Sequence, residues 1–456
     1  MSISKPSIPK GTRDFGPIEM ARRNYILETI KDTFRLFGFQ QLETPAMESL
    51  ATLTGKYGDE GDQLLFKILN SGDYLKQVTM EDLAQGAPSM LPKISEKGLR
   101  YDLTVPFARF VVMNRNELVF PFKRFQIQPV WRADRPQRGR YREFYQCDAD
   151  VVGTDSLVCE AEILLMIKRV FATFGLEEYT IKVNNRKILT GLAEVIGAPG
   201  KEQELCVAID KLDKIGWEKV REELFERGFS VEATEKLAPM VLRQPDGNAE
   251  SIAFFRDLMK DSAVGSRGVS ELVEVFSLLD KLGGEQTFIQ FDPMLARGLS
   301  YYTGAIFEVK VNNVSIGSVS GGGRYDNLTG VFGLPGVSGV GFSFGVDRIY
   351  DVLNELGLFQ DLSESPVKVM IAHFGPEEMA FGLGILSKLR NAGIASEIFP
   401  EVAKIKKQFV YADKKQISYA IVIGSEEMKS GKITLKNLKS GEQQTMDFDG
   451  VLAELT

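Results

Sequence analysis

Five arginines fall among the eleven residues from Arg132 to Arg142, within the stretch RADRPQRGRYREF. The chain has a formal net charge of -7, so such a dense cationic segment needs an explanation. A charge run is commonly a solvated surface loop. Here the flanks PFKRFQIQPVW and YREFYQCDADVV are rich in aromatic and β-branched residues, which predicts a β-hairpin with the arginines at its tip. Because arginine binds carboxylate or phosphate through paired hydrogen bonds, we expect several of these side chains to converge on an anion site.

Polar residues that could line the same site occur in two nearby segments. Asp102 and Thr104 alternate in LRYDLTVPFARF, and in a strand they would point to the same side. On the return strand of the hairpin, Gln146, Asp148 and Asp150 have the same parity and would share one face. For Asp102 and Thr104, hydrogen bonds to nearby backbone are the simpler explanation.

Another candidate segment is LARGLSYYTGAIFEV, which places Arg297, Tyr301 and Tyr302 near a predicted strand. A buried ion pair would also explain an arginine in this apolar setting.

The segment GVGFSFGVDRIYDVL combines glycines with a helix start. Glycines weaken a strand unless another group approaches the backbone closely, which is the role we expect for Gly339, Gly341 and Gly345. Asp347 suits the first turn of the following helix, whereas Arg348 adds positive charge where the helix dipole is already positive. An anion bound beside Arg348 would favour this placement, and an ordinary surface arginine is the alternative.

Composition limits the classes of function. At 456 residues the chain should form two to four domains, and 44% hydrophobic with 26% charged residues is typical of a folded soluble protein. The N-terminus has no apolar signal region and no apolar run could span a bilayer, so we expect a cytoplasmic protein without a membrane partner. The three cysteines have no metal-ligand spacing, which disfavours disulfides and structural zinc. His373, the single histidine, is expected at a strand end, and its isolation disfavours catalytic triads.

The coarse pattern predicts an α+β protein with an inserted module. Apolar residues at helical spacing predict an opening helix from Pro17 to Gly38, followed by a strand broken at Pro45 and a helix with Pro106 in its first turn. We expect a catalytic core in two parts, residues 1–186 and 286–360. Residues 187–285 are rich in Lys and Glu and read as a helical insertion, and residues 366–456 alternate strand and helix as a separate α/β domain.

Nucleotide-binding loops of the common kinds are absent. The sequence contains no GxxxxGK[ST], and the GGGRYD run lacks the spacing of a dinucleotide fingerprint. A nucleotide phosphate would therefore have to be held by arginines on antiparallel strands.

Taken in chain order, these segments resemble the class II aminoacyl-tRNA synthetases and, among them, the histidyl-tRNA synthetase family. The opening helix and the strand ending at Pro45 are similar to motif 1, and the hairpin from Phe122 to Gly153 to motif 2. The other matching segments are PKGTRDF, LRYDLTVPFAR, the two histidine signatures LARGLSYYTG and GSVSGGGRYDNL, and motif 3 at GVGFSFGVDRIYDVL. The resemblance implies an antiparallel catalytic sheet flanked by helices, with a C-terminal anticodon-binding domain.

The resemblance also implies a reaction. L-Histidine would be activated with ATP, assisted by Mg²⁺ between the β- and γ-phosphates, and transferred to the 3'-terminal adenosine of tRNA(His) by a homodimer. No metal site formed by protein side chains is expected. The alternatives are a regulatory paralogue, the regulatory subunit of ATP phosphoribosyltransferase, and a class II enzyme for proline or threonine.

Roles for the amino-acid site follow from the resemblance alone. Asp102, Thr104 and Gln146 would bind the α-ammonium group. The imidazole would lie against Asp150 and Tyr302. Tyr301 and Tyr325 would complete this histidine site. Relatives carry Glu where this chain has Asp150, which leaves space for a water in the ring contact.

The resemblance assigns ATP and RNA contacts in the same way. Arg132 would bind the α-phosphate and Arg348 the γ-phosphate, while Arg297 would bridge the substrate carboxylate and the α-phosphate. Arg297 and Arg132 would therefore be the catalytic residues. Arg135 and Gln137 match positions that approach the acceptor end of tRNA.

A basic segment in the last domain is the candidate anticodon contact. Residues 366–456 hold 12 Lys and Arg against 11 Asp and Glu, so this part of an acidic chain is close to neutral. In AKIKKQFVYADKK, Lys404, Lys407, Tyr411 and Lys414 recur at helical spacing and would form one basic face bearing an aromatic ring. A solvated helix face explains the charges equally well, and the resemblance favours RNA.

Overall fold

The computed structural model describes residues 5–54, 64–243, 247–296, 302–359 and 365–455. It divides into two compact units. One comprises Met1–Arg13 with Ile26–Leu358, and the other Asp14–Tyr25 with Phe359–Thr456. Arg297 and Tyr301, two predicted site residues, lie outside the described residues.

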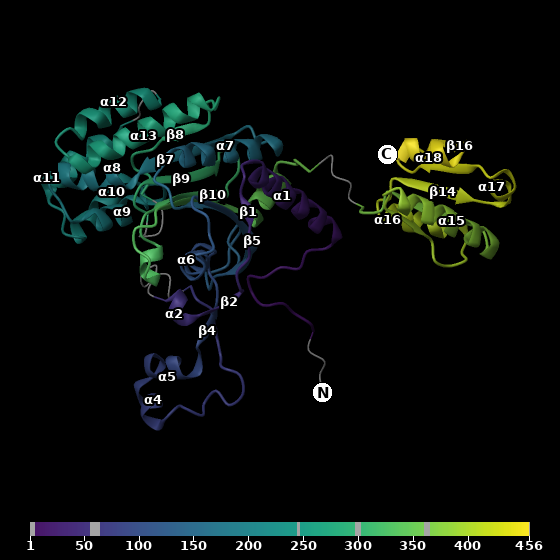
Figure 1. Ribbon diagram of the computed structural model, residues 1–456, viewed down its shortest axis with the longest axis horizontal. Helices are drawn as coiled ribbons and strands as arrows, with labels where there is room; N and C mark the ends of the chain where they lie inside the picture. The colour runs from purple at the N-terminus through teal and green to yellow at the C-terminus, as the bar shows by residue number, and fades with distance from the viewer. Residues whose placement is uncertain (1–4, 55–63, 244–246, 297–301, 360–364, 456) are drawn as a thin grey trace. The chain divides into compact units, whose positions relative to one another are not determined.

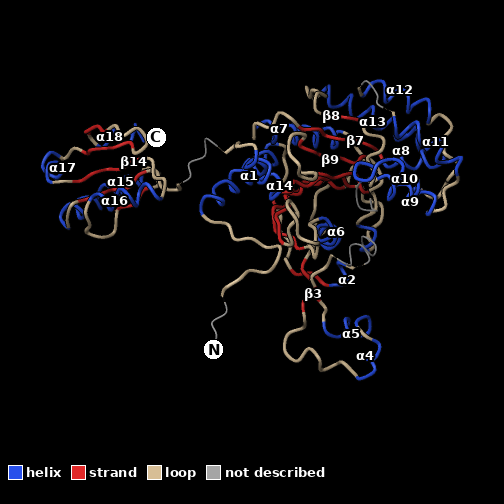
Figure 2. Tube along the Cα trace, turned by 180° about the vertical axis from the view of Figure 1, so that it is seen from behind, coloured by secondary structure: helices blue, strands red, loops and turns tan. Residues whose placement is uncertain are grey.

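The larger unit is built on an eight-stranded sheet in the order β1-β5-β6-β11-β10-β9-β7-β8 (Figures 1 and 2). Its strands are β1 (Gln40–Gln41), β5 (Phe122–Trp131), β6 (Glu143–Val152), β7 (Tyr179–Asn185), β8 (Ile289–Phe291), β9 (Ala305–Val311), β10 (Ser320–Tyr325) and β11 (Gly339–Gly345). Only the outer pairs β1–β5 and β7–β8 are parallel within this sheet. The predicted α+β class and the hairpin β5–β6 are confirmed.

Helices cover one face of this sheet. The helix α1 (Pro17–Leu36) places Phe34 against Phe342 and Phe344 of β11, at ring distances of 5.9 and 6.2 Å. From α7 (Val158–Thr173), Phe171 reaches Phe344 at 6.0 Å. Because side chains alternate along β11, Gly341 and Ser343 point to the other face, which is left for a binding site.

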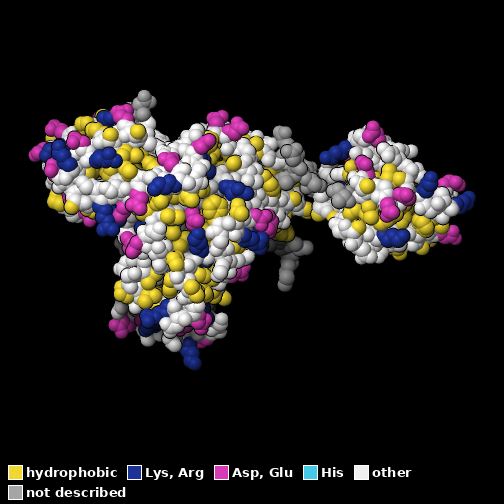
Figure 3. All heavy atoms as spheres, turned by 45° about the horizontal axis from the view of Figure 1, so that its top comes forward, with side chains coloured by type: hydrophobic (Ala, Val, Ile, Leu, Met, Phe, Trp, Pro, Cys, Tyr) yellow, Lys and Arg dark blue, Asp and Glu magenta, His cyan; other side chains and the backbone are white. Residues whose placement is uncertain are grey.

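In the predicted helical insertion, every regular element among the described residues is a helix. These are α8 (Arg186–Val195), α9 (Glu202–Ile209), α10 (Leu212–Glu226), α11 (Val231–Leu242), α12 (Asn248–Leu258) and α13 (Ala263–Lys281). They stand beside β7 and β8, with α13 in contact with β7 and α12 in contact with β8 (Figure 1). On the face drawn in Figure 3, acidic and basic side chains are interspersed over this part of the molecule, as on a solvated surface.

A projection extends from the same unit below the sheet (Figures 1 and 2). Its base is the small sheet β2-β4-β3, and its tip carries two short helices. The elements are β2 (Met47–Ser49), α2 (Leu50–Leu53), β3 (Lys67–Ile68), α4 (Met80–Gln85), α5 (Ala87–Ile94) and β4 (Lys97–Leu99).

The prediction that Asp102 and Thr104 alternate in a strand is wrong. The strand β4 ends at Leu99, and Thr104 already begins the helix α6 (Thr104–Met113). The helix starts this early because Pro106 is the third helical residue, where a backbone N–H would have no intrahelical partner anyway. The remaining elements of this unit are the short 3-10 helix Thr329–Phe332 and α14 (Val346–Glu355).

The smaller unit contains a five-stranded sheet in the order β13-β12-β14-β15-β16. Its first three strands are parallel and the last two pairs antiparallel. The elements are β12 (Val369–His373), α15 (Pro376–Asn391), β13 (Ser396–Ile398), α16 (Ile405–Lys414), β14 (Tyr419–Ile423), α17 (Ser425–Ser430), β15 (Ile433–Asn437), β16 (Gln443–Met446) and α18 (Phe448–Leu455). The expected α/β alternation is confirmed.

His373 ends β12, as predicted, and is fully buried with Nε2 2.9 Å from the carbonyl oxygen of Phe399. In the described part of the chain, no helix combines the length and apolar character that crossing a membrane requires.

Candidate active site

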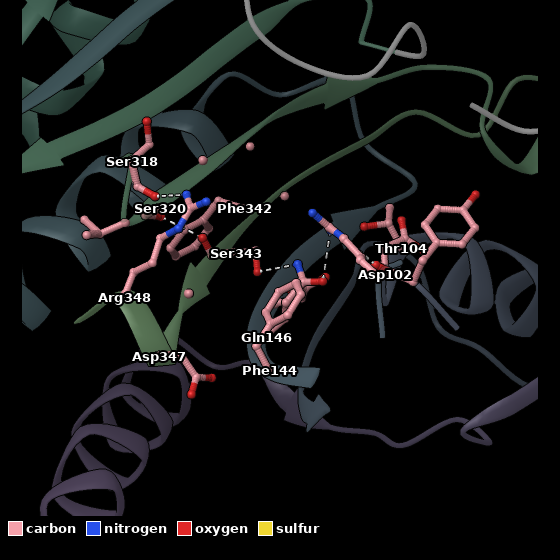
Figure 4. A pocket seen from close by; sticks show the side chains of 18 of the residues that line it. Asp102, Thr104, Phe144, Gln146, Ser318, Ser320, Phe342, Ser343, Asp347 and Arg348 are labelled. Atoms are coloured by element: carbon pink, nitrogen blue, oxygen red, sulfur yellow. Dashed lines mark hydrogen bonds between the residues drawn. The ribbon is translucent and has the colours of Figure 1, made fainter. Parts of the chain in front are cut away.

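A cavity of about 390 Å³ opens on the uncovered face of the large sheet. Most of the predicted site residues that the structure describes line it: Asp102, Thr104, Arg132, Gln146, Asp150, Tyr302, Tyr325 and Arg348. Figure 4 shows Asp102 and Thr104 on one side and Arg348 with Ser318 on the other, with Gln146 and Ser343 between them. The sequence therefore identified residues from five separate segments that the fold brings together.

Asp150 is held by two neighbours on the floor of this cavity. Its Oδ2 lies 2.7 Å from Nη2 of Arg124 in a buried ion pair, and its Oδ1 accepts a 2.7 Å hydrogen bond from the Tyr325 hydroxyl. Burial raises the pKa of Asp150, while Arg124 and then Tyr325 oppose this rise by stabilising the carboxylate. Both carboxylate oxygens therefore lie against protein groups, Arg124 on one side and Tyr325 on the other.

Two glycines of β11 make room for this pair, as the sequence predicted. A Cβ on Gly341 would stand 2.0 Å from Asp150 Oδ1, and one on Gly339 would stand 2.4 Å from the Tyr325 ring. The close approach comes from these two side chains. Gly345 differs, because its nearest contact of 3.5 Å is ordinary.

Arg132 is oriented toward the middle of the cavity. Its Nε donates to the Tyr101 carbonyl at 2.9 Å, and its guanidinium lies 5.2 Å from the centre of the Phe144 ring. Its Nη2 donates a long 3.5 Å bond to Gln146, whose own amide donates to the Ser343 hydroxyl at 3.0 Å (Figure 4). These contacts join the hairpin to β11 and fix where the charge of Arg132 lies.

Arg348 connects the hairpin tip to the loop before β10. Its Nε donates to the Gly139 carbonyl at 2.7 Å and its Nη1 to the Ser318 carbonyl at 2.6 Å. As predicted, it lies in the first turn of α14, and Gly345 is the residue that caps the helix. Its neighbour Asp347 is ion-paired at 2.5 Å with Arg13, from the PKGTRDF segment.

The expectation that several hairpin arginines converge holds for only two of the five. Arg132 and Arg140 line the cavity. Arg138 instead pairs with Glu355, and Arg142 donates to the carbonyl of Asp134 at 3.1 Å. The fifth, Arg135, is exposed to solvent.

Comparison with known proteins shows which family has this site. A family model described as histidyl-tRNA synthetase matches residues 93–349, more than half of the chain. The chain is 58% identical to the histidine–tRNA ligase of Cytophaga hutchinsonii over 99% of its own length and all of that protein. It belongs to the histidyl-tRNA synthetase family. A second model, described as an anticodon binding domain, matches residues 368–456.

Other relatives and solved structures support the same family and fold. The histidine–tRNA ligase of Bacteroides fragilis is 57% identical over 99% of both chains. The crystal structure of histidyl-tRNA synthetase from Nostoc sp. PCC 7120 superimposes with a TM-score of 0.85 at 30% identity, covering 99% of each chain. A Bacillus halodurans structure named as an ATP phosphoribosyltransferase regulatory subunit/histidyl-tRNA synthetase has a TM-score of 0.71 at 21% identity, which shows the fold alone.

A second, larger cleft of about 940 Å³ adjoins the first and shares Gly139, Arg140, Ser318 and Arg348 with it. It runs between the insertion helices and strands β7 to β9. Its basic residues include Arg138, Lys182, Lys214, Arg243 and Lys310. Gln137, predicted to approach the tRNA acceptor end, lines this cleft and not the first.

Sequence reasoning missed Arg124, which is fully buried and contacts Asp150. The signal was present in the hairpin register. Trp131 pairs with Glu143, and counting back from this pair sets Arg124 directly opposite Asp150. For Asp148 the sequence predicted only that it shares a face with Gln146 and Asp150. Nothing in the sequence indicated that Ser343 of β11 pairs with it across the sheet.

Proposed function

We infer that this chain activates L-histidine with ATP to form histidyl-adenylate and transfers the histidyl group to the 3'-terminal adenosine of tRNA(His). One observation carries the inference in a chain of this family. A single cavity is lined by the carboxylates of Asp102 and Asp150 and by the guanidinium groups of Arg132 and Arg348. Figure 4 shows Asp102 and Arg348 on opposite sides of it. An amino acid and a nucleotide phosphate need these opposite charges side by side.

The first step needs no general base, because the substrate carboxylate is already ionised at neutral pH. It attacks the α-phosphorus, the bond to the bridging oxygen of pyrophosphate breaks, and negative charge grows on the phosphoryl oxygens. Arg132 is proposed to stabilise this charge, while Arg348 holds the γ-phosphate. An oriented electrostatic contact of this kind is worth about 3–4 kcal/mol in the transition state. The proposed bridging role of Arg297 belongs to a residue outside the described ranges.

Mg²⁺ is proposed to arrive bound to the phosphates of ATP. Within the ranges that the structure describes, no group of three or more His, Cys, Asp or Glu side chains could hold a metal ion. We assign the described residues no step through Mg²⁺.

For the RNA, we propose that Arg135 and Gln137 contact the acceptor end and that Lys404, Lys407 and Lys414 contact the anticodon region. The three lysines are exposed on or beside α16. The aromatic part of the predicted basic face needs correction. Tyr411 is partly buried, edge-on to Phe399 at 5.3 Å with Lys415 over its ring at 4.7 Å, so this ring is no open platform for a base.

We also propose a homodimer located in the cytoplasm. The support is family membership, in which motif 1 forms the subunit interface. Mass measurement of the purified protein in solution tests the dimer, and a monomer would contradict it.

Histidine-dependent exchange of pyrophosphate into ATP tests the proposed function. We expect exchange with histidine and not with proline or threonine, together with histidine charging of tRNA(His). Exchange with another amino acid would reassign the substrate. Failure with every amino acid would favour the regulatory paralogue.

A variant pair sharpens this assay. Arg132→Ala should lower exchange about 100- to 1000-fold, because the lost group faces the developing charge. Arg221→Ala is the matched control, since Arg221 is nearly half exposed on α10 and pairs with Glu218 on the same helix. Equal activity of the two variants would contradict the role of Arg132.

A further inference from the structure

Asp148 is another carboxylate that lines the cavity, and the proposed function gives it no role. Asp148 lies on β6 between Gln146 and Asp150 and lines the cavity with them. It is only 3% exposed, and its Oδ1 has no hydrogen-bond partner among the residues that the structure describes. A buried acceptor left unbonded destabilises the folded protein, so its presence calls for a donor that arrives from elsewhere.

The charges around Asp148 show what kind of donor fits. Asp150 and Asp102 both face it and raise the pKa of its carboxyl by repulsion. Arg124 opposes them, but its guanidinium is already paired with Asp150 at 2.7 Å. Arg100 also interacts electrostatically with Asp148, but the hydrogen bonds of its guanidinium go to backbone carbonyls and to Gln128. No described cation is paired with Asp148 itself, whose Oδ1 is the unbonded oxygen.

Strand pairing places Asp148 beside the predicted ammonium site. Ser343 stands directly opposite Asp148 on β11, and its hydroxyl stabilises the ionised carboxylate. The same hydroxyl accepts a 3.0 Å bond from Gln146, one of the predicted ammonium ligands. Figure 4 shows Gln146 and Ser343 facing the cavity that Asp102 borders. Asp150, in contrast, is committed to Arg124 and Tyr325.

We propose that Asp148 shares the α-ammonium group of histidine with Asp102, accepting one of its hydrogen bonds at Oδ1. An ammonium group has three donors and a full positive charge, so it satisfies the unbonded oxygen and removes the repulsion between the two carboxylates. This inference rests on the proposed function. It makes Asp148 a specificity residue that favours an amino acid over the same molecule without its ammonium group.

Binding of histidine should be coupled to the loss of a proton from Asp148. Burial, together with Asp150 and Asp102, raises the pKa of Asp148 to about 7 against the opposing effects of Arg124 and Ser343. A bound cation stabilises the carboxylate and lowers this pKa, so histidine binding near neutral pH should release protons from the Asp148 carboxyl. Affinity should fall as the pH drops below 7, because the site must then lose a proton to bind.

Titration calorimetry of the full-length protein tests the proposal with two ligands, L-histidine and imidazole-4-propionate, which lacks the ammonium group. Asp148→Asn should weaken histidine about 10- to 100-fold, the worth of a hydrogen bond to a charged group, and change imidazole-4-propionate only a few-fold. Asp155→Asn, an exposed site just after β6, is the matched control and should change neither. The ratio of wild-type to Asp148→Asn affinity should rise from pH 6 to pH 8, since the titration of the ligand itself cancels in the ratio.

Equal weakening of both ligands, or no weakening, would overturn the proposal. If Asp148→Asn does not fold, Asp148→Ser, which also removes the charge and keeps a small polar side chain, takes its place in the same two titrations. Failure of the proposed function is distinguishable, because the wild-type protein would then bind no histidine.

Discussion

Removing the Tyr325 hydroxyl tests whether Asp150 is oriented as the structure indicates. Tyr325→Phe keeps the ring and deletes one buried donor, whose bond to Asp150 Oδ1 is 2.7 Å long. A hydrogen bond to a charged partner contributes about 1.5–3 kcal/mol. The carboxylate would then be held by Arg124 alone, at 2.7 Å from Oδ2.

Two measurements should respond to this change. The free energy of unfolding should fall by about 1.5–3 kcal/mol, because Asp150 is buried and cannot replace the lost bond with water from outside. The KM for histidine in pyrophosphate exchange should rise, because Asp150 and Tyr325 both line the histidine end of the cavity. The KM for ATP should not change, since the phosphate-binding arginines keep their contacts.

Tyr179→Phe is the matched control. Tyr179 is a buried tyrosine of the same sheet, on β7, and packs against Phe171 and Phe288 at ring distances of 4.9 and 4.3 Å. Combining Tyr325→Phe with Asp150→Asn should give a coupling energy of about 0.5–3 kcal/mol in a double-mutant cycle. Additive losses, or a Tyr325→Phe variant no different from the Tyr179→Phe control, would refute the reasoning.

Two further predictions concern the sheet and the RNA. Gly341→Ala should raise the KM for histidine more than tenfold in pyrophosphate exchange, because its Cβ would overlap Asp150 Oδ1 at 2.0 Å; wild-type kinetics would show that the carboxylate can move aside without loss. Replacing both Lys404 and Lys407 by Glu should raise the KM for tRNA in charging assays and leave histidine-driven exchange unchanged. A charge reversal at the exposed Lys429 serves as the control, and equal effects at both places would contradict a specific contact.

Much of the fold could be predicted because its signals are local. The apolar spacing of Ile26, Ile30 and Phe34 predicted the opening helix, and all three residues are buried in it. Gly38 ends that segment with φ of 82°, a conformation that glycine adopts easily. The hairpin was equally clear, since alternating residues and a polar tip restrict two strands to one register.

The wrong predictions share a cause, which is that side-chain direction depends on distant neighbours. The alternation of Asp102 and Thr104 fits a strand, and only the packing of a helix that starts at Thr104 decides otherwise. Likewise, nothing near Arg138 in the sequence indicates that Glu355, 217 residues away, would bind it. Arg124 was overlooked because a charged residue on a strand usually reads as solvent-facing, whereas the register buries it against Asp150.

The charges of both signs that line one cavity explain why one site can serve both substrates. The carboxylates Asp102, Asp148 and Asp150 are buried, and Arg132 and Arg348 line the same cavity. A zwitterionic amino acid placed there has its ammonium group drawn to these acids and its carboxylate directed toward the arginines. The same arginines attract the phosphates of ATP, which draws the carboxylate toward the α-phosphorus. Orientation by fixed charges of both signs therefore helps to align the reacting atoms, which is the main requirement of an activation step that needs no proton transfer.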